Sequence, residues 1–375
     1  MGVLTQEQKD AFWRDGCLVV PNAVSADLLA RLRAEIAGWV DESRAHTKPF
    51  GPPCVDGRPR FDMGKEHSAE NPALRRINNP SDISPAYLEA MRDSDMTEMV
   101  AELIGPDVKF HHCKINLKLM GAKTEVLYHQ DFAYTPHTND DIITALLFLD
   151  DVDETNGALT IVPGSHKGPM YSLFDGERFT GAVSDADEKA LLAQSIPCYG
   201  PAGSVCLMHT KLAHGSAPNA GTKPRGLYIC VYTAADAVPL ARNPMPSTHE
   251  GEVIRGKPAR FARITETRVE LPQQPKSASF FTVQESLRLR LPRRLNVALA
   301  CLGALPGDDL VEQDVELANC IGGAHELLLD EVRILGVQRQ DFSHQPGGDH
   351  GNDFLAVNCV LLEELEDQVR VQMQR

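Results

Sequence analysis

The stretch Tyr128-His129-Gln130-Asp131, followed far downstream by His214 and Arg225, decides how this chain is interpreted. At a strand end, His129 and Asp131 are two residues apart, so their side chains leave the backbone on the same side and both can reach one ion. Two imidazoles and one carboxylate can hold Fe(II) on one triangular face and leave three adjacent positions open. An H-x-D pair alone is weakly indicative, because short polar pairs are common in turns. His214, from a distant strand, is the expected third ligand.

Several further segments resemble the phytanoyl-CoA dioxygenase family of Fe(II)/2-oxoglutarate oxygenases. The residues that carry this resemblance are Leu4 to Asp15, Lys114-Ile115-Asn116-Leu117-Lys118, Tyr128 to Asp131, Asn156-Gly157-Ala158-Leu159, Pro163-Gly164-Ser165-His166-Lys167-Gly168, His214-Gly215-Ser216-Ala217-Pro218-Asn219 and Arg225. In that family the first His, the Asp and the last His bind iron. The resemblance therefore implies that His129, Asp131 and His214 are the metal ligands, and it covers roughly residues 1 to 282.

The same resemblance implies a site for the co-substrate 2-oxoglutarate. The family's Arg eleven residues after the distal His pairs with the far carboxylate, which is Arg225 here, and the Ser two residues after that His often assists, which is Ser216. A planar guanidinium suits a carboxylate through two parallel hydrogen bonds and keeps its proton when buried. Arg225 also opens the run Arg225-Gly-Leu-Tyr-Ile-Cys-Val-Tyr, which is typical of a buried strand. The alternative is a surface arginine after a Gly-Thr-Lys-Pro turn.

The segment from Val108 to Leu119 alternates between polar and apolar residues. His112, Lys114, Asn116 and Lys118 share one face, and Cys113, Ile115, Leu117 and Leu119 share the other. A half-exposed edge strand with a solvated face is one interpretation. Because the segment leads into the H-x-D turn, we favour a polar face that points into the barrel mouth, with Asn116 and Lys118 near the co-substrate or substrate.

Other histidines are interpreted as structural. In His111-His112-Cys113, adjacent strand residues should point to opposite faces and so cannot all bind one ion. His166, in a Pro-Gly-Ser-His turn, and His209, five residues before His214, are expected to be hydrogen-bonded scaffold. In the C-terminal segment, His344, Asp349, His350 and Asp353 surround Gly347-Gly348, where a flexible loop is favoured over a second metal site.

The order of patterns along the chain predicts the fold. Residues 5–15 and 25–46 have helical periodicity, the second after the cap Ser25, and another helix follows Pro85. From Val108 to about Tyr232, short strands alternate with turns, as in a jelly roll. We expect a mostly β fold with flanking helices, built on a double-stranded β-helix barrel of the jelly-roll or cupin type.

Residues 47–82 are rich in proline, glycine and charge and are expected to form a long loop over the site entrance. A solvated charge run is the default interpretation of its basic residues, which are Arg58, Arg60, Lys65, Arg75 and Arg76. Long loops in compact enzymes are often lids, so a role for Arg75 or Arg76 in binding a substrate anion stays open.

Composition narrows the function classes. The chain has 375 residues, 42% hydrophobic content, no apolar run long enough to span a bilayer and no signal-peptide core at its start, which favours a cytoplasmic protein without membrane contact. Nine cysteines without a C-x-x-C pair predict reduced, scattered thiols and argue against a zinc finger. A formal net charge of -15 disfavours nucleic acid as a partner and favours small neutral or cationic molecules as substrates.

Two domains are expected: residues 1–282 as the catalytic domain and residues 283–375 as a C-terminal extension of unknown role. The resemblance implies a dioxygenase that uses Fe(II), O2 and 2-oxoglutarate, with ascorbate as a possible aid, to hydroxylate an unactivated C–H bond and release succinate and CO2. Related halogenases replace the metal-binding carboxylate with a small residue, so Asp131 favours hydroxylation. The alternative is a non-catalytic cupin-like binding protein. Neither the substrate nor the oligomeric state follows from the sequence.

Overall fold

The computed structural model describes residues 2–273, 281 and 284. The chain divides into two compact units, Met1–Arg290 and Leu291–Arg375. The predicted tail features at His344 to Asp353 lie outside the described residues, as does nearly all of the expected C-terminal extension.

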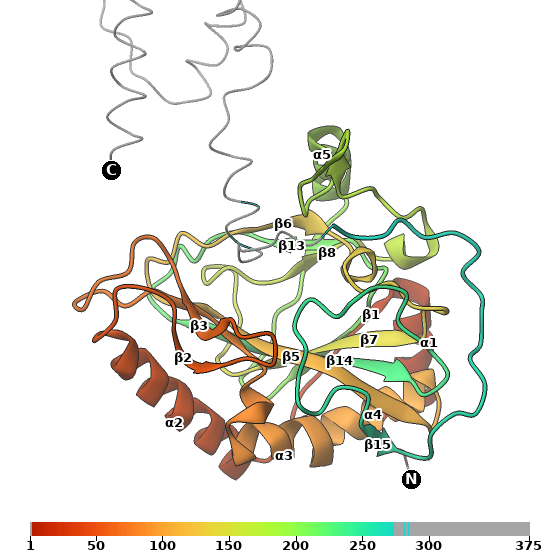
Figure 1. The fold of residues 1–375 in the computed structure, drawn as a ribbon, viewed down its shortest axis with the longest axis horizontal. Coiled ribbons are helices and arrows are strands. Elements are labelled where there is room, and N and C mark those ends of the chain that lie inside the picture. Colours follow the sequence, from red (N-terminus) through yellow and green to blue (C-terminus); the bar gives the residue numbers. More distant parts are fainter. Residues whose placement is uncertain (1, 274–280, 282–283, 285–375) are drawn as a thin grey trace, which may run out of the picture. The chain divides into compact units, whose positions relative to one another are not determined.

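Two antiparallel sheets dominate the described part of the chain (Figure 1). The larger sheet has nine strands, with β15 (Val253–Arg255) paired to β5 and the others in the order β1 (Cys17–Val20), β12 (Val205–His209), β7 (Ile142–Phe148), β14 (Arg225–Ala234), β5 (Val108–Lys118), β4 (Leu74–Asn78), β3 (Pro59–Met63) and β2 (Phe50–Pro53). The smaller sheet has the order β11 (Ile196–Pro197), β8 (Thr160–Ile161), β13 (His214–Ser216) and β6 (Val126–His129). Strands β9 (Phe174–Asp175) and β10 (Arg178–Phe179) form a separate hairpin. This arrangement confirms the predicted jelly-roll class.

Helices α2, α3 and α4 lie along one face of the larger sheet in Figure 1. The α-helices are α1 (Gln6–Asp15), α2 (Ala26–Ser43), α3 (Pro85–Asp93), α4 (Asp95–Ile104) and α5 (Asp185–Leu192). Single 3-10 turns are η1 (Pro80–Asp82), η2 (Asp131–Ala133) and η3 (Ser165–Lys167). Both predicted N-terminal helices are present, and their caps Thr5 and Ser25 each accept a hydrogen bond from a backbone N–H of the first turn, which satisfies a donor that has no partner within the helix.

Strand β5 divides the interior into two environments. Its apolar residues Cys113, Ile115 and Leu117 are buried in the core cluster that also contains Tyr87 and Val100 of the helices. Its polar residues, on the opposite face, line the space between the two sheets. The predicted alternation of faces is therefore confirmed, and the edge-strand interpretation is wrong because β4 and β14 pair with β5 on both sides.

The prediction that residues 47–82 form a long loop over the site entrance is wrong. This segment contributes β2, β3 and β4, which extend the larger sheet beyond β5. Arg58 and Lys65 are exposed, as expected of a solvated charge run, but Arg60, Arg75 and Arg76 are only 3%, 5% and 6% exposed. Arg75 donates to Asp62 at 2.8 Å, so at least part of the charge run is neutralised inside the fold.

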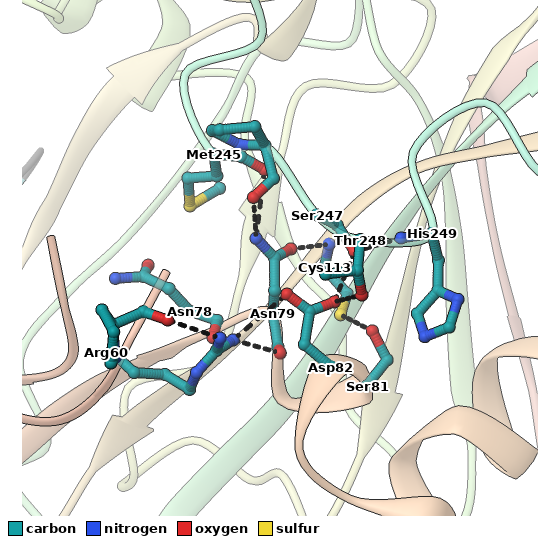
Figure 2. A network of polar contacts seen from close by, with 12 residues as sticks. Arg60, Asn78, Asn79, Ser81, Asp82, Cys113, Met245, Ser247, Thr248 and His249 are labelled. Atoms are coloured by element: carbon teal, nitrogen blue, oxygen red, sulfur yellow. Dashed lines mark hydrogen bonds and ion pairs between the residues drawn. The ribbon is translucent and has the colours of Figure 1, made fainter. Parts of the chain in front are cut away.

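Arg60 belongs to a buried polar network that joins β4 and η1 to the segment after β14 (Figure 2). It donates to the carbonyl oxygens of Asn78 and Asn79 at 2.9 and 2.7 Å. Asp82 in turn accepts hydrogen bonds from Ser247 and Thr248 at 2.6 and 3.0 Å. The network explains the burial of Arg60 as structural, because a buried charge needs this density of partners.

Asn79 is the centre of that network and provides a stability prediction. Its Nδ2 donates to the carbonyls of Met245 and Pro246 at 3.1 and 3.0 Å, and its Oδ1 accepts from the N–H of Cys113 at 3.0 Å. Asn79→Asp keeps the shape but places an oxygen against two carbonyl oxygens, which should lower the free energy of unfolding by about 2–4 kcal/mol. Urea unfolding measures this loss. The exposed control Asn71→Asp should change the midpoint little, and equal midpoints for both variants would contradict the assignment.

In the described residues, no helix is both long and apolar enough to cross a membrane.

Candidate metal and co-substrate site

Three predicted metal ligands converge at the smaller sheet. His129 ends β6, Asp131 begins η2 and His214 begins β13. His129 and His214 are direct cross-strand partners, with ring centroids 4.2 Å apart. Asp131 Oδ1 lies 3.5 Å from His129 Nε2 and 3.8 Å from His214 Nε2, and the three possible ligand atoms lie within 4.8 Å of one another.

Backbone hydrogen bonds orient both imidazoles. His129 Nδ1 lies 2.8 Å from the carbonyl oxygen of Leu127, and His214 Nδ1 lies 2.9 Å from that of Leu212. A carbonyl can only accept, so each Nδ1 carries a proton and each ring turns its Nε2 toward Asp131. Burial lowers the pKa of His214 to about 4, which keeps its imidazole neutral. This is the protonation state that a metal ligand requires.

The carboxylate of Asp131 is also held in place. Its Oδ2 accepts a hydrogen bond from Thr144 Oγ1 of β7 at 2.8 Å, which leaves Oδ1 toward the imidazoles. Burial opposes the charge of Asp131, but the neighbouring histidines and Lys114 outweigh it and hold the pKa well below the usual value. Two imidazoles that turn Nε2 toward one carboxylate oxygen fit a divalent iron ion.

Thr144 was not predicted as a site residue, although a threonine in the otherwise apolar run of β7 is a sequence clue. Thr144→Val removes the hydroxyl at nearly constant volume and should lower Fe(II) affinity about 10- to 100-fold, the usual effect of losing a hydrogen bond to a ligand. Competition with a calibrated chelator measures this change. Thr144→Ser keeps the hydroxyl and should stay near wild type, so a Ser variant as weak as the Val variant would contradict the role.

A pocket between the sheets extends from this cluster. Besides His129, Asp131, Thr144 and His214, it is lined by residues of both sheets and of nearby loops: Arg76, Lys114, Asn116, Leu117, Lys118, Thr124, Val126, Leu146, Leu159, Met208, Ser216, Arg225, Leu227, Ile229 and Phe281. All seven predicted site residues are therefore in one pocket. Lys114 also lines the pocket, with Asp131 and Arg76 among its charged neighbours. The sequence predicted the polar face on which Lys114 lies, but it did not single out Lys114 as a site residue.

Arg225 is a buried cation that needs an anion. It is 2% exposed and pairs across strands with Lys118. Its Nε has no hydrogen-bond partner among residues 2–273, 281 and 284, which is costly for a buried charged donor. Burial lowers its pKa to about 10, so the guanidinium stays charged at neutral pH. A ligand carboxylate in the pocket fits this unpaired donor.

Lys118 and Ser216 lie at the same end of the pocket. Lys118 Nζ donates to Ser216 Oγ at 2.7 Å and also contacts the carbonyl oxygens of Ser216 and Ala217. Burial, together with Arg225, lowers the pKa of Lys118 to about 6. Asn116, two residues earlier on the same face of β5, accepts a hydrogen bond from Arg76 Nε at 3.1 Å. Lys118 therefore orients Ser216, and Asn116 orients Arg76.

Among the described residues, no histidine other than His129 and His214 lines the pocket. His166 Nε2 lies 3.3 Å from the carbonyl oxygen of Trp13, and His209 Nδ1 accepts from the N–H of Lys211 at 3.1 Å, as expected of scaffold residues. The geometric argument about His111 and His112 was wrong, because their Nδ1 atoms are 2.6 Å apart. The register between β5 and β14 shifts at this point, so His111 is the extra residue of a β-bulge and its side chain turns toward that of its neighbour.

Comparison with known proteins identifies the class. A family model described as phytanoyl-CoA dioxygenase (PhyH) matches residues 12–227, more than half of the chain. A probable alpha-ketoglutarate-dependent hypophosphite dioxygenase of Stutzerimonas stutzeri is 33% identical over 216 residues, which cover 56% of this chain and 75% of that protein. An ectoine dioxygenase of Bordetella bronchiseptica is 26% identical over 253 residues, covering 62% and 76%. Among solved structures, EctD from S. alaskensis in its apoform has a TM-score of 0.53 at 21% identity, covering 69% of this chain and 89% of that one.

A jelly roll with this pocket and these relatives defines an enzyme of the iron- and 2-oxoglutarate-dependent oxygenase class. Within that class, the chain belongs to the phytanoyl-CoA dioxygenase family.

Proposed function

We propose that this chain is a hydroxylase in which His129, Asp131 and His214 bind Fe(II) and Arg225 binds the far carboxylate of 2-oxoglutarate. One observation carries the proposal: a cluster of two oriented imidazoles and a carboxylate shares a pocket with a buried arginine whose Nε lacks an acceptor among the described residues. Iron together with 2-oxoglutarate supplies the O2-activating chemistry that oxidises a substrate C–H bond and releases succinate and CO2.

The chain's own residues bind and orient the reactants. Arg225 neutralises the carboxylate that lies farthest from the metal, with Ser216 as a second donor that Lys118 holds in position. Leu146, Met208 and Ile229 line the same pocket and exclude water, which strengthens these charge interactions. Asp131 stays ionised and would supply the carboxylate ligand of the iron, which favours hydroxylation over halogenation.

The basic character of the pocket supports a small anionic substrate. Arg76 and Lys114 line it in addition to Arg225, and Asp131 is the one carboxylate among the lining residues that the structure describes. Burial lowers the pKa of Lys114 to about 8, although Asp131 counteracts this effect, so the ammonium is mostly charged at pH 7. After 2-oxoglutarate has occupied the Arg225 end, positive charge remains beside the metal cluster.

This charge favours a second candidate reaction, the oxidation of a P–H bond in a small phosphorus oxyanion. The relative from Stutzerimonas stutzeri is described as acting on hypophosphite, and an anion of that size suits Arg76 and Lys114. Succinate formation should be compared with hypophosphite, small phosphonates, carboxylates, ectoine and proline as added substrates. Stimulation by anions alone supports the anionic class. Stimulation by neutral or zwitterionic compounds alone would contradict it, and no succinate with Fe(II) and 2-oxoglutarate under any condition would contradict the hydroxylase itself.

We further propose that the catalytic domain is the compact unit Met1–Arg290, a few residues longer than the expected domain of residues 1–282. Gln284 accepts a hydrogen bond from the N–H of Leu127 at 3.0 Å and donates to the carbonyl oxygen of Gly181 at 2.6 Å, while the ring of Phe281 lies 4.4 Å from the Arg76 guanidinium. A chain shortened after Arg290 should therefore fold, bind Fe(II) and 2-oxoglutarate and form succinate. A chain shortened after Pro275 loses these contacts and should melt at a lower temperature. An insoluble or iron-free protein ending at Arg290 would show that the tail belongs to the catalytic domain.

A further inference from the structure

Three cysteines that are far apart in the sequence meet in the apolar cluster that also contains the pocket residue Met208. Cys17 begins β1, Cys206 is in β12 and Cys198 follows β11. Cys17 Sγ lies 3.4 Å from Cys206 Sγ and 3.8 Å from Cys198 Sγ, and the three sulfur atoms lie within 4.8 Å of one another. The prediction of scattered thiols is therefore wrong for these three, although all six cysteines in the described part of the chain are free thiols.

The sheet holds these thiols in fixed positions. Cys206 pairs with Val19 and Cys17 pairs with Met208, so Cys17 and Cys206 are diagonal neighbours on one face of the β1–β12 pair. The N–H of Cys198 donates to the carbonyl oxygen of Leu159 at 2.8 Å. Apolar side chains surround the group, and Cys198 and Cys206 are 5% and 0% exposed. Cys17 is partly exposed and gives access from solvent.

The strand geometry disfavours a disulfide between the closest pair. Diagonal neighbours on antiparallel strands have Cα atoms about 7–8 Å apart. A disulfide needs a Cα separation of about 4.4–6.8 Å, so Cys17 and Cys206 could be joined only with backbone movement inside a sheet. The thiols can approach one another without that movement, as the ligands of a shared ion do.

The sulfur positions match a metal site. With metal–sulfur bonds of about 2.3 Å, three sulfurs around one ion in a plane lie about 4 Å apart. The distances of 3.4 and 3.8 Å are close to that value before any ion has drawn the thiols together. We propose that Cys17, Cys198 and Cys206 form a three-sulfur site for a soft monovalent ion, Cu(I), separate from the iron site.

The ligand set distinguishes Cu(I) from zinc. Structural zinc is almost always bound by four protein ligands, whereas no fourth His, Cys, Asp or Glu joins this group among the described residues. Thiolates are soft ligands that select Cu(I), an ion that accepts three-coordination. Binding releases the thiol protons to water, and the oxidation state of copper does not change.

We expect ion binding at this three-cysteine site to change the packing of the catalytic pocket. Cys206 and Met208 are two residues apart on β12 and belong to the same apolar cluster, and Met208 also lines the pocket beside the iron ligands. The two sites thus share one strand and one packed cluster while using different donor atoms.

The test is an anaerobic titration of the full chain with Cu(I) in competition with a calibrated chelator. The background carries Cys301→Ser, Cys320→Ser and Cys359→Ser, so that cysteines outside the described residues cannot contribute. We expect one ion per chain, with three sulfur neighbours by copper X-ray absorption. Cys17→Ser, the mildest change because Cys17 is partly exposed, should weaken binding about a hundredfold or more.

Matched variants assign the site. Cys54→Ser removes a buried thiol elsewhere and should leave the affinity unchanged, and His214→Ala should also keep the copper while losing iron. Circular dichroism of each variant verifies that it folds. Unchanged affinity in Cys17→Ser, equal loss in Cys54→Ser, or a copper centre with nitrogen neighbours would each overturn the proposal.

Discussion

His214→Ala should lose iron and all turnover while the protein stays folded. His214 supplies one of three protein ligands, and its Nε2 is fixed by the hydrogen bond from Nδ1–H to the carbonyl of Leu212. Alanine leaves two ligands, which cannot define the triangular face on which chelation and O2 activation depend. His129→Ala should behave in the same way. Iron content after anaerobic loading, followed by succinate formation, measures the effect.

The matched control is His209→Ala, five residues earlier. His209 is also buried and hydrogen-bonded to the backbone, but it does not line the pocket. This variant should keep its iron even if it melts at a lower temperature. Full iron occupancy in His214→Ala, or equal loss in both variants, would contradict the assigned ligands.

Arg225→Ala should raise the apparent KM for 2-oxoglutarate about 10²- to 10⁴-fold while leaving iron affinity nearly unchanged. Removing one partner of a buried charge pair costs about 3–5 kcal/mol, because the remaining carboxylate is left without its counter-charge. Arg225 begins β14 and is separate from the metal ligands. Its removal should therefore change the affinity for 2-oxoglutarate without changing the affinity for Fe(II). Initial rates at varied 2-oxoglutarate, together with chelator competition for Fe(II), measure both.

Two further variants separate charge from geometry in this prediction. Arg225→Lys keeps the positive charge but loses the planar pair of donors, so its KM should lie between wild type and Arg225→Ala. Lys118→Met removes the neighbouring amine and should have the smaller effect, because burial lowers the pKa of Lys118 to about 6 and its contacts are to Ser216 and Ala217. A normal 2-oxoglutarate dependence in Arg225→Ala, with the defect in Lys118→Met instead, would reassign the site.

The sequence predicts that His129, Asp131 and His214 come together because part of this information is local. His129 and Asp131 lie two residues apart at a strand end, and that spacing carries their geometry. The sequence predicted that His214 lies on a distant strand. In the structure, His214 of β13 pairs with His129 of β6. The alternation in β5 similarly predicted a polar face, which lines the pocket.

The errors arise where long-range pairing overrides composition. Proline, glycine and arginine in residues 47–82 suggested a solvated loop, but strands β2 to β4 pair at the edge of the sheet and their arginines find buried partners such as Asp62. The cluster of Cys17, Cys198 and Cys206 depends on how three segments that are distant in the sequence pack together. The spacing of these residues along the chain does not predict that packing. The bulge at His111 depends on the register of β14, which is set by the partner strand.

The most direct test is an anaerobic titration of the Fe(II)-loaded protein with 2-oxoglutarate, followed by the visible charge-transfer absorption of an iron-chelated 2-oxo acid. Wild type should develop this absorption with one 2-oxoglutarate per chain. Arg225→Ala should need a far higher 2-oxoglutarate concentration, and His214→Ala should not develop it. Absorption of equal strength and affinity in wild type and His214→Ala, or none in wild type loaded with iron, would contradict the assignment of His129, Asp131, His214 and Arg225 as the catalytic site.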